Sequence, residues 1–139
     1  MRQFGEEPTG EVIERPGAYA VIVDHEWRVA VVVLSGGAYL PGGGIEGEES
    51  VEEALRREVR EETGLEVEIL SGKGIARQYV PWRGRVVNKI GHYFLCRPGA
   101  QGAATEADHL LEWWPGSRAI RELTHPSQQW MVQRSLSPC

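Results

Sequence analysis

The chain has 139 residues, 41% of them hydrophobic and 25% charged, which suits one globular domain. A net charge of −5 argues against a sequence-independent nucleic-acid coat, which needs a basic surface, so nucleic acid is not an expected partner. No run approaches the roughly 18 apolar residues of a membrane span, and no signal peptide is visible. Two cysteines, one of them the last residue, predict no structural disulfide and a cytoplasmic protein.

The first part of the chain predicts short strands separated by turns. Residues 1–16 are polar and are expected to form a flexible lead-in to a single domain spanning 1–139. The β-branched runs 19–23 and 29–34 are predicted to pair as a hairpin, because Asp24-His25-Glu26 between them is a turn signal. A short strand is expected at 38–40, between glycine-rich segments.

A helix is predicted to run from Ser50 to about Thr63. Ser50 followed by Glu53 forms a capping box, and Gly64 is favourable just past a helix end. The remaining expected elements are strands near 65–80, 86–96 and 110–114 and helices over 117–123 and 126–136. This order indicates a mixed α/β fold, with helices packed on a mixed sheet.

Three glutamates, Glu58, Glu61 and Glu62, crowd the last turn of the predicted helix. At about 100° per residue, they share the face that should point at the core. Like charges at i,i+3 and i,i+4 repel by roughly 0.2–0.5 kcal/mol per pair. Carboxylates near a helix C-terminus also oppose its dipole, by roughly 0.3–1 kcal/mol each. A divalent cation would offset these costs, and oxygen ligands favour Mg²⁺ or Mn²⁺.

A solvated acidic helix is the alternative. Arg56, Arg57 and Arg60 could form ordinary i,i+4 pairs with the glutamates of the same helix. Such pairs would explain the charges that point away from the core, but not an acidic trio that faces it. The metal site is therefore the favoured interpretation.

The trio belongs to a longer motif over residues 43–65, G-x5-E-x7-R-E-U-x-E-E-x-G-U, where U is aliphatic. Its fixed positions hold Gly43, Glu49, Arg57, Glu58, Glu61, Glu62 and Gly64. At about one chance in 15 per fixed identity, seven together arise roughly once in 10⁸ start positions. The chain resembles the Nudix hydrolase family, in its small MutT-like form. The resemblance implies a Nudix α/β/α sandwich, with a mixed central sheet and helices on both sides.

The resemblance also implies a metal site. Its ligands would be Glu58, Glu61 and Glu62, together with the backbone carbonyl of Gly42. The glycines there let the backbone approach phosphate or metal closely.

The catalytic residues implied by the resemblance lie around the same helix. Arg57 and Glu49 have an orienting role in the family, and a bidentate bond between them would lock the loop to the helix. The base that takes the proton of water varies among members. Here it is Glu61 or Glu106, with Asp108 and Glu112 as less favoured substitutes.

The reaction implied is hydrolysis of a nucleoside diphosphate linked to another group, in which Mg²⁺, or Mn²⁺ in its place, activates the attacking water. We expect an enzyme that converts a nucleoside triphosphate, oxidised or not, to monophosphate and pyrophosphate. ADP-sugar hydrolysis, for example of ADP-ribose, is the alternative. A nucleotide-sensing domain without activity would predict decay of the motif, and RNA decapping would favour a basic groove and extra domains.

The substrate is less clearly indicated. Pro81, sixteen residues after Leu65, has the spacing of ADP-sugar members but not their Ser-Pro-Gly context. Purine-sanitising members read the base with an asparagine near the C-terminal helix, where this chain has Gln128. The candidate substrate-binding residues are Gly43, Arg77, Tyr79, Asn88 and Gln128. Related small members form dimers or monomers, so a homodimer remains open.

Overall fold

The computed structural model describes residues 1–6, 8, 10–106 and 108–137. In chain order the elements are β1 (Arg2–Phe4), β2 (Val12–Ile22), β3 (Arg28–Leu34), β4 (Gly37–Tyr39), β5 (Gly42–Gly44), α1 (Val51–Thr63), β6 (Leu65–Trp82), β7 (Arg85–Gln101), β8 (Leu110–Pro115), α2 (Gly116–Glu122) and α3 (Pro126–Leu136).

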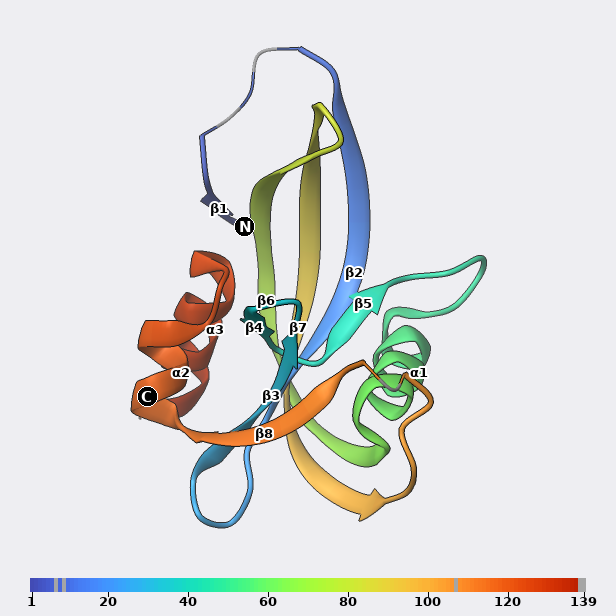
Figure 1. The fold of residues 1–139 in the computed structure, drawn as a ribbon, viewed down its shortest axis with the longest axis vertical. Helices are drawn as coiled ribbons and strands as arrows, with labels where there is room; N and C mark the ends of the chain where they lie inside the picture. Colours follow the sequence, from blue (N-terminus) through green and yellow to red (C-terminus); the bar gives the residue numbers. More distant parts are fainter. Residues whose placement is uncertain (7, 9, 107, 138–139) are drawn as a thin grey trace.

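The strands form two sheets. The larger is mixed, with the order β1-β6-β7-β2-β5, and the smaller is antiparallel, with the order β4-β3-β8. β6 and β7 make a long antiparallel hairpin, and β2 runs parallel to β7 along its whole length. Figure 1 shows this hairpin and β2 rising together from the centre of the molecule. β4 and β5 follow each other in the chain but belong to different sheets, and β5 is itself the glycine segment.

Helices cover both faces of the larger sheet (Figure 1). Successive side chains of β2 point to opposite faces of the sheet and so enter two separate hydrophobic clusters. Tyr19 and Val21 pack in the cluster that contains α2 and α3 residues. Ala18, Ala20 and Ile22 pack instead in the cluster that contains α1 residues. The predicted α/β sandwich, with a mixed sheet and helices on both sides, is confirmed.

Helix α1 begins and ends where the sequence predicts. Ser50 Oγ accepts a hydrogen bond of 3.1 Å from the Glu53 amide, and the Glu53 carboxylate accepts one of 2.9 Å from the Ser50 amide. Gly64 ends the helix in the left-handed conformation, with φ 77°. The caps and the buried side chains of Ala54, Leu55 and Val59 together set which way each glutamate of the helix points.

The predicted hairpin of 19–23 with 29–34 is wrong. The turn is present, because the Asp24 carboxylate accepts hydrogen bonds from the backbone amides of Glu26 and Arg28. Beyond it, the two strands meet only at a single bridge between Val23 and Val29. β2 then pairs with β5 and β7, and β3 with β4 and β8, so the two strands belong to different sheets.

The N-terminal segment 1–16 contributes to the larger sheet. β1 pairs parallel with β6, and β2 begins at Val12. The other predicted elements agree within a few residues, except that β7 continues to Gln101, past its predicted end at 96. Among the described residues, none of the helices has the length and apolarity needed to cross a membrane.

Candidate active site

Arg57 connects the glycine-rich loop to the acidic end of α1. Its Nε and Nη2 donate to the two carboxylate oxygens of Glu49 at 2.6 and 2.9 Å. Nη2 also donates to the Gly44 carbonyl at 3.0 Å, and Nη1 donates to Glu58 Oε1 at 2.9 Å and to Glu61 Oε2 at 3.3 Å. The hydrogen bonds from Arg57 to Glu49 hold the pKa of the Glu49 carboxyl down, at about 2. The bidentate bond between Arg57 and Glu49 that the sequence suggested is present.

The other arginines of α1 do not support the alternative of i,i+4 pairing. Arg56 donates to the Val67 carbonyl at 2.7 Å, and Arg60 binds the Glu66 carboxylate at 2.8 Å, beyond the end of the helix. Only Arg57 makes an i,i+4 contact, with Glu61. Arg56 and Arg60 therefore connect α1 to β6 and do not neutralise the inward-facing glutamates.

Two glycines let the loop lie directly against the acidic residues. Gly42 has φ 148°, and a Cβ there would collide with the Ala18 carbonyl oxygen. Its backbone amide donates a hydrogen bond of 2.8 Å to Glu62 Oε1. A Cβ at Gly43 would lie 2.6 Å from the Glu58 carboxyl carbon. No larger residue fits at either place without moving a carboxylate or the neighbouring strand.

Ionisation of the inward acids is unfavourable. Burial, together with the nearby carboxylates of Glu58, Glu106 and Glu61, raises the pKa of Glu62 to about 8 against the opposing Gly42 hydrogen bond. Burial also raises the pKa of Glu58, although Arg57 opposes this shift. A bound divalent cation would favour the ionised form of both carboxylates. The predicted inward-facing carboxylates are thus present, and their oxygen donors suit a hard cation.

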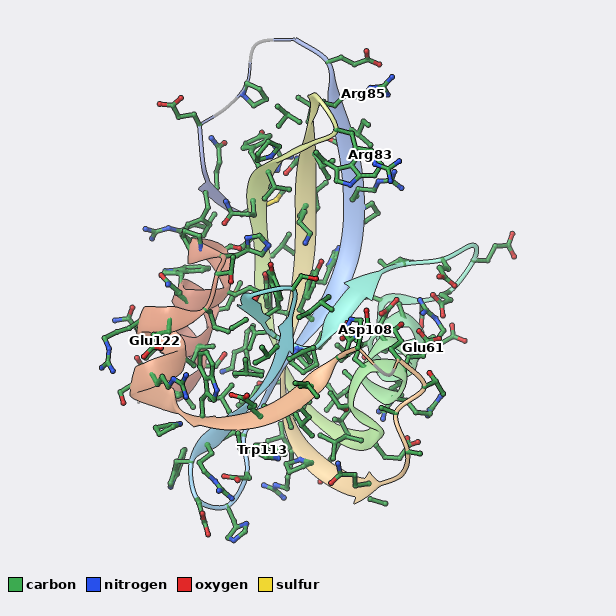
Figure 2. The ribbon with its side chains drawn as sticks, viewed as in Figure 1. Glu61, Arg83, Arg85, Asp108, Trp113 and Glu122 are labelled. Atoms are coloured by element: carbon green, nitrogen blue, oxygen red, sulfur yellow. The ribbon has the colours of Figure 1, made fainter. Side chains whose placement is uncertain are left out.

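A loop from the second half of the chain completes the acidic cluster. The backbone amides of Thr105 and Glu106 donate to the Glu61 carbonyl at 3.0 and 3.1 Å, which fastens this loop to the end of α1. Figure 2 places Glu61 and Asp108 at this junction, where the chain approaches β8. Carboxylate oxygens of Glu58, Glu61 and Glu106 come within 4.8 Å of one another, which is close enough to share a cation.

His109 is a member of the site that the sequence did not single out. Its Nε2 lies 3.1 Å from Glu106 Oε2 and 3.6 Å from Glu62 Oε2, and its Nδ1 lies 3.0 Å from Asp108 Oδ1. The sequence feature that could have indicated His109 was its position, one residue before a strand and three residues after Glu106. Glu112, by contrast, accepts a hydrogen bond from the Trp114 indole and takes no part in the cluster.

A cavity of about 500 Å³ opens beside these residues. Its polar lining includes Glu62, His109, Lys89, His125 and Gln128, and the three glycines of β5 also line it. The rest of the wall is mainly apolar or aromatic, formed by Tyr19, Val32, Leu34, Tyr39, Leu40, Val80 and Pro81. An acidic cluster that opens onto an apolar cavity can hold a metal-bound phosphate and an attached organic group.

Of the five candidate substrate residues, Gly43 and Gln128 line this cavity. Gln128 is 2% exposed, and its Oε1 accepts a hydrogen bond of 2.9 Å from the Leu40 amide. Asn88 is 1% exposed on β7, and its Oδ1 has no hydrogen-bond partner among the described residues.

Arg77 and Tyr79 lie on β6 and are not among the residues that line the cavity. Arg77 Nε lies 3.1 Å from the Met1 sulfur. The hairpin carries Arg83 and Arg85 to its far tip, well away from Glu61 (Figure 2). The aromatic and basic stretch of this hairpin therefore lies largely outside the cavity.

Lys89 and His125 are further cavity residues that the sequence did not indicate. Burial lowers the pKa of Lys89 despite the nearby charge of Glu62. Burial, together with the charge of Lys89, lowers the pKa of His125 to about 4, so its imidazole is neutral at pH 7. A lysine within the apolar run of β7 was the only signal in the sequence.

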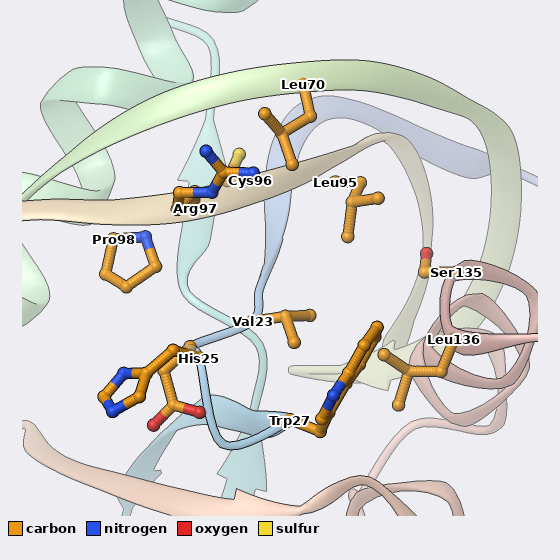
Figure 3. A pocket seen from close by; sticks show the side chains of 11 residues that line it. Val23, His25, Trp27, Leu70, Leu95, Cys96, Arg97, Pro98, Ser135 and Leu136 are labelled. Carbon is orange, nitrogen blue, oxygen red and sulfur yellow. The ribbon is translucent and has the colours of Figure 1, made fainter.

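A second cavity, of about 570 Å³, lies at the other end of β7 (Figure 3). Its wall is mainly apolar, with the Trp27 ring facing Leu136 across it, and it contains Cys96, whose pKa burial raises to about 12. None of the acidic residues of α1 lines it. The first cavity is therefore the one that belongs to the candidate active site.

Solved structures of similar fold come from several organisms. The chain matches a MutT NUDIX hydrolase from Burkholderia pseudomallei at 22% identity and a TM-score of 0.73, covering 87% of this chain and 97% of that one. A NUDIX hydrolase from Nitrosomonas europaea matches at 18% identity and a TM-score of 0.72, covering 86% of each chain. A MutT protein from Methanosarcina mazei Go1 matches at 21% identity and a TM-score of 0.68, covering 91% and 96%.

The sequence itself was also compared with known families. No curated protein gave a significant match. The NUDIX domain model matches residues 14–134, which include the whole acidic motif, the loop of Glu106 and most of α3. This match confirms the Nudix family that the motif predicted, and the chain belongs to the NUDIX domain family.

Proposed function

We propose that this chain is a Mg²⁺-dependent pyrophosphohydrolase that cleaves a nucleoside triphosphate, oxidised or not, to a monophosphate and pyrophosphate. Nudix hydrolases act on small nucleotide substrates and generally use divalent metal ions. The observation that carries the proposal is the cluster of Glu58, Glu61, Glu62 and Glu106 at the rim of a cavity of about 500 Å³. Mn²⁺ would suit the same oxygen donors.

The residues that would hold the cation are Glu58, Glu61 and Glu62, with the carbonyl of Gly42. When bound, the ion would neutralise phosphate charge and lower the pKa of the attacking water. Gly43 lets phosphate approach α1, because it has no side chain between the loop and Glu58. Arg57 and Glu49 act as positioning residues, since they join the loop to the helix by hydrogen bonds of 2.6–2.9 Å.

Glu106 is the stronger candidate for the base that takes the proton of water. Its carboxylate lies 3.1 Å from His109 Nε2, and the imidazole could hold the carboxylate in position. Glu61, the other candidate, already accepts a hydrogen bond from Arg57. His109, the partner of Glu106, also lines the cavity.

ADP-sugar hydrolysis is the second candidate, and the position of Pro81 favours it. Pro81 has the spacing of ADP-sugar members, and it lines the cavity. None of the described residues that line the cavity is an arginine, which could hold a sugar phosphate. Triphosphate cleavage therefore stays the main proposal.

A panel of substrates with Mg²⁺ tests these alternatives. Canonical and 8-oxo triphosphates, ADP-ribose and diadenosine tetraphosphate would be incubated with the protein, and the products identified by chromatography. Monophosphate and pyrophosphate from triphosphates support the main proposal, and AMP with ribose phosphate supports the second. Equal turnover with EDTA in place of Mg²⁺ would contradict the metal dependence, and no turnover of any substrate would favour a nucleotide-sensing domain.

A further inference from the structure

The cavity contains one ammonium group that the proposed chemistry does not use. Lys89 projects into it from β7, between the glycine-rich loop and the start of α3. Its Nζ makes no hydrogen bond or ion pair with any residue in the described part of the chain. Most lysines in folded proteins keep the ammonium in water, so a half-buried one without a partner is unusual. A bound ligand is the natural source of the missing acceptor.

Two of the other polar side chains nearby are engaged by the fold. Gln128 Oε1 accepts from the Leu40 amide at 2.9 Å, and Gln78 Oε1 accepts from the Ser127 amide at 3.2 Å. His125 packs against the Tyr39 ring at 5.3 Å and is neutral. Among the described residues that line the cavity, Lys89 is the one lysine or arginine, and Gln128, expected to read the base, has a structural role.

The lining of the cavity is chemically mixed. Glu62 and His109, which would hold a metal-bound phosphate, share it with Lys89 and with apolar and aromatic side chains such as Tyr39 and Pro81. Apolar and aromatic side chains suit a planar, uncharged ring better than a second phosphate. A nucleotide whose phosphates are held at the acidic residues would therefore bring its base into the cavity that Lys89 lines.

We propose that Lys89 is a specificity-determining residue that donates a hydrogen bond to a keto oxygen of the nucleobase. It would favour 6-oxopurine and 4-oxopyrimidine nucleotides over those that carry an amino group at the same position. An amino group would present N–H donors to the ammonium and leave both sides unpaired. This inference rests on the proposed function only in that a nucleotide occupies the cavity.

Binding of nucleoside monophosphates tests the inference without requiring turnover. IMP and AMP differ at the 6-position of the purine, and UMP and CMP at the 4-position of the pyrimidine. Calorimetry would give the Kd of each for the wild type, for Lys89→Met and for Lys73→Met. Methionine keeps a long unbranched side chain without the charge. Lys73, the other of the chain's two lysines, lies outside the cavity and serves as the matched control.

We expect the wild type to bind IMP over AMP, and UMP over CMP, by about 10-fold, which a single well-placed base contact can supply. Lys89→Met should abolish both preferences, and Lys73→Met should keep them. Thermal melting would show that both variants fold. Equal affinities in the wild type would overturn the inference, as would a preference that survives Lys89→Met. An equal loss for all four ligands would place Lys89 at the phosphate and overturn it as well.

The same measurements separate this inference from the proposed function. Selective binding of IMP without hydrolysis of any triphosphate would contradict the proposed activity and leave the role of Lys89 intact. Hydrolysis of triphosphates, with equal binding of nucleotides that carry keto and amino bases, would support the proposed activity and overturn the role of Lys89.

Discussion

The backbone amide of Gly42 donates a hydrogen bond of 2.8 Å to Oε1 of Glu62. This contact orients a carboxyl group whose pKa is raised to about 8, by burial and by three neighbouring acids, even against the hydrogen bond itself. The same glycine was expected to contact the metal through its carbonyl. Its amide has a second role, because it holds the side chain of Glu62, an expected metal ligand, in place before the metal binds.

The first prediction concerns pH and follows from the Glu62 pKa of about 8, against 4.5 for an unperturbed glutamate. Between these values the folded protein binds more protons at Glu62 than the unfolded chain does. The free energy of unfolding should therefore fall as pH rises from about 5 to about 8 in EDTA. Mg²⁺ favours the ionised form, so the rise in Tm that it produces should grow over the same range.

Thermal denaturation with EDTA and with Mg²⁺ at several pH values measures this effect. Glu62→Gln cannot ionise, and it should show a smaller dependence of the Mg²⁺ effect on pH. A rise in Tm of the same size at about pH 5 and about pH 8 would contradict the prediction.

Glu62→Gln should also reduce kcat with Mg²⁺ at least about 100-fold, because a neutral amide is a weaker ligand and provides less charge stabilisation. The amide oxygen can still accept the Gly42 hydrogen bond, so the fold should be kept. Glu52→Gln, on the exposed side of the same helix, is the control and should retain activity. Steady-state kinetics on the best triphosphate decide the matter, and an active Glu62→Gln enzyme would remove Glu62 from the metal site.

Two adjacent glycines provide a matched pair. A Cβ at Gly43 would lie 2.6 Å from the Glu58 carboxyl carbon, whereas a Cβ at Gly44 would have no neighbour within 4 Å. Gly43→Ala should weaken Mg²⁺ binding by about 10-fold or more, since a displaced ligand costs at least about 1.4 kcal/mol. Gly44→Ala should bind Mg²⁺ as the wild type does. Calorimetric titration with Mg²⁺ compares them, and equal affinities would mean that Glu58 adjusts freely.

Arg57→Lys should destabilise the protein more than Arg60→Lys does. Lysine cannot reproduce the bidentate bond to Glu49 together with the bonds to Gly44 and Glu58, and hydrogen bonds to charged groups are stronger than those between neutral groups. The pair of Arg60 with Glu66 is half exposed on both sides, and because water and salt screen such a pair, its loss should cost less. Urea denaturation would measure both, and similar losses would show that Arg57 is an ordinary surface arginine.

Glu106→Gln and Glu61→Gln distinguish the two candidate bases. If Glu106 takes the proton, Glu106→Gln should lower kcat about 100-fold or more with little change in KM. Glu61→Gln should act mainly on the Mg²⁺ concentration needed for half-maximal activity. The opposite pattern would assign the base to Glu61.

Local signals in the sequence were sufficient for α1 and for the acidic cluster. The capping box, the terminal glycine and the helical spacing all act within a few residues, so the direction of Glu58 and Glu62 could be predicted before any tertiary contact was known. The pairing of β2 could not. Its partner β7 lies far along the chain, and a β-branched run does not say which other run it will meet.

The substrate side of the site was unpredictable for the same reason. Lys89 and His125 come from β7 and from the residue before α3, and nothing in the spacing between them indicates a shared cavity. Gln128 was chosen for its order in the chain, but its side chain is used to hold Leu40. Glu106 could be predicted because related proteins carry an acid at about this position after the motif. His109 could be identified only from the conformation of the loop.

The loop that carries Glu106 is attached to α1 by the main-chain amides of Thr105 and Glu106, which donate to the Glu61 carbonyl at 3.0 and 3.1 Å, and the Thr105 hydroxyl adds a longer bond of 3.5 Å to the same carbonyl. No side chain of the loop is needed for these two bonds. Substitutions there can therefore change which acid or base faces the helix without changing where the loop lies. A library of variants in this loop would change the acidic and basic groups that face α1 while keeping the loop in place. The loop is therefore a good starting place for laboratory evolution of the enzyme.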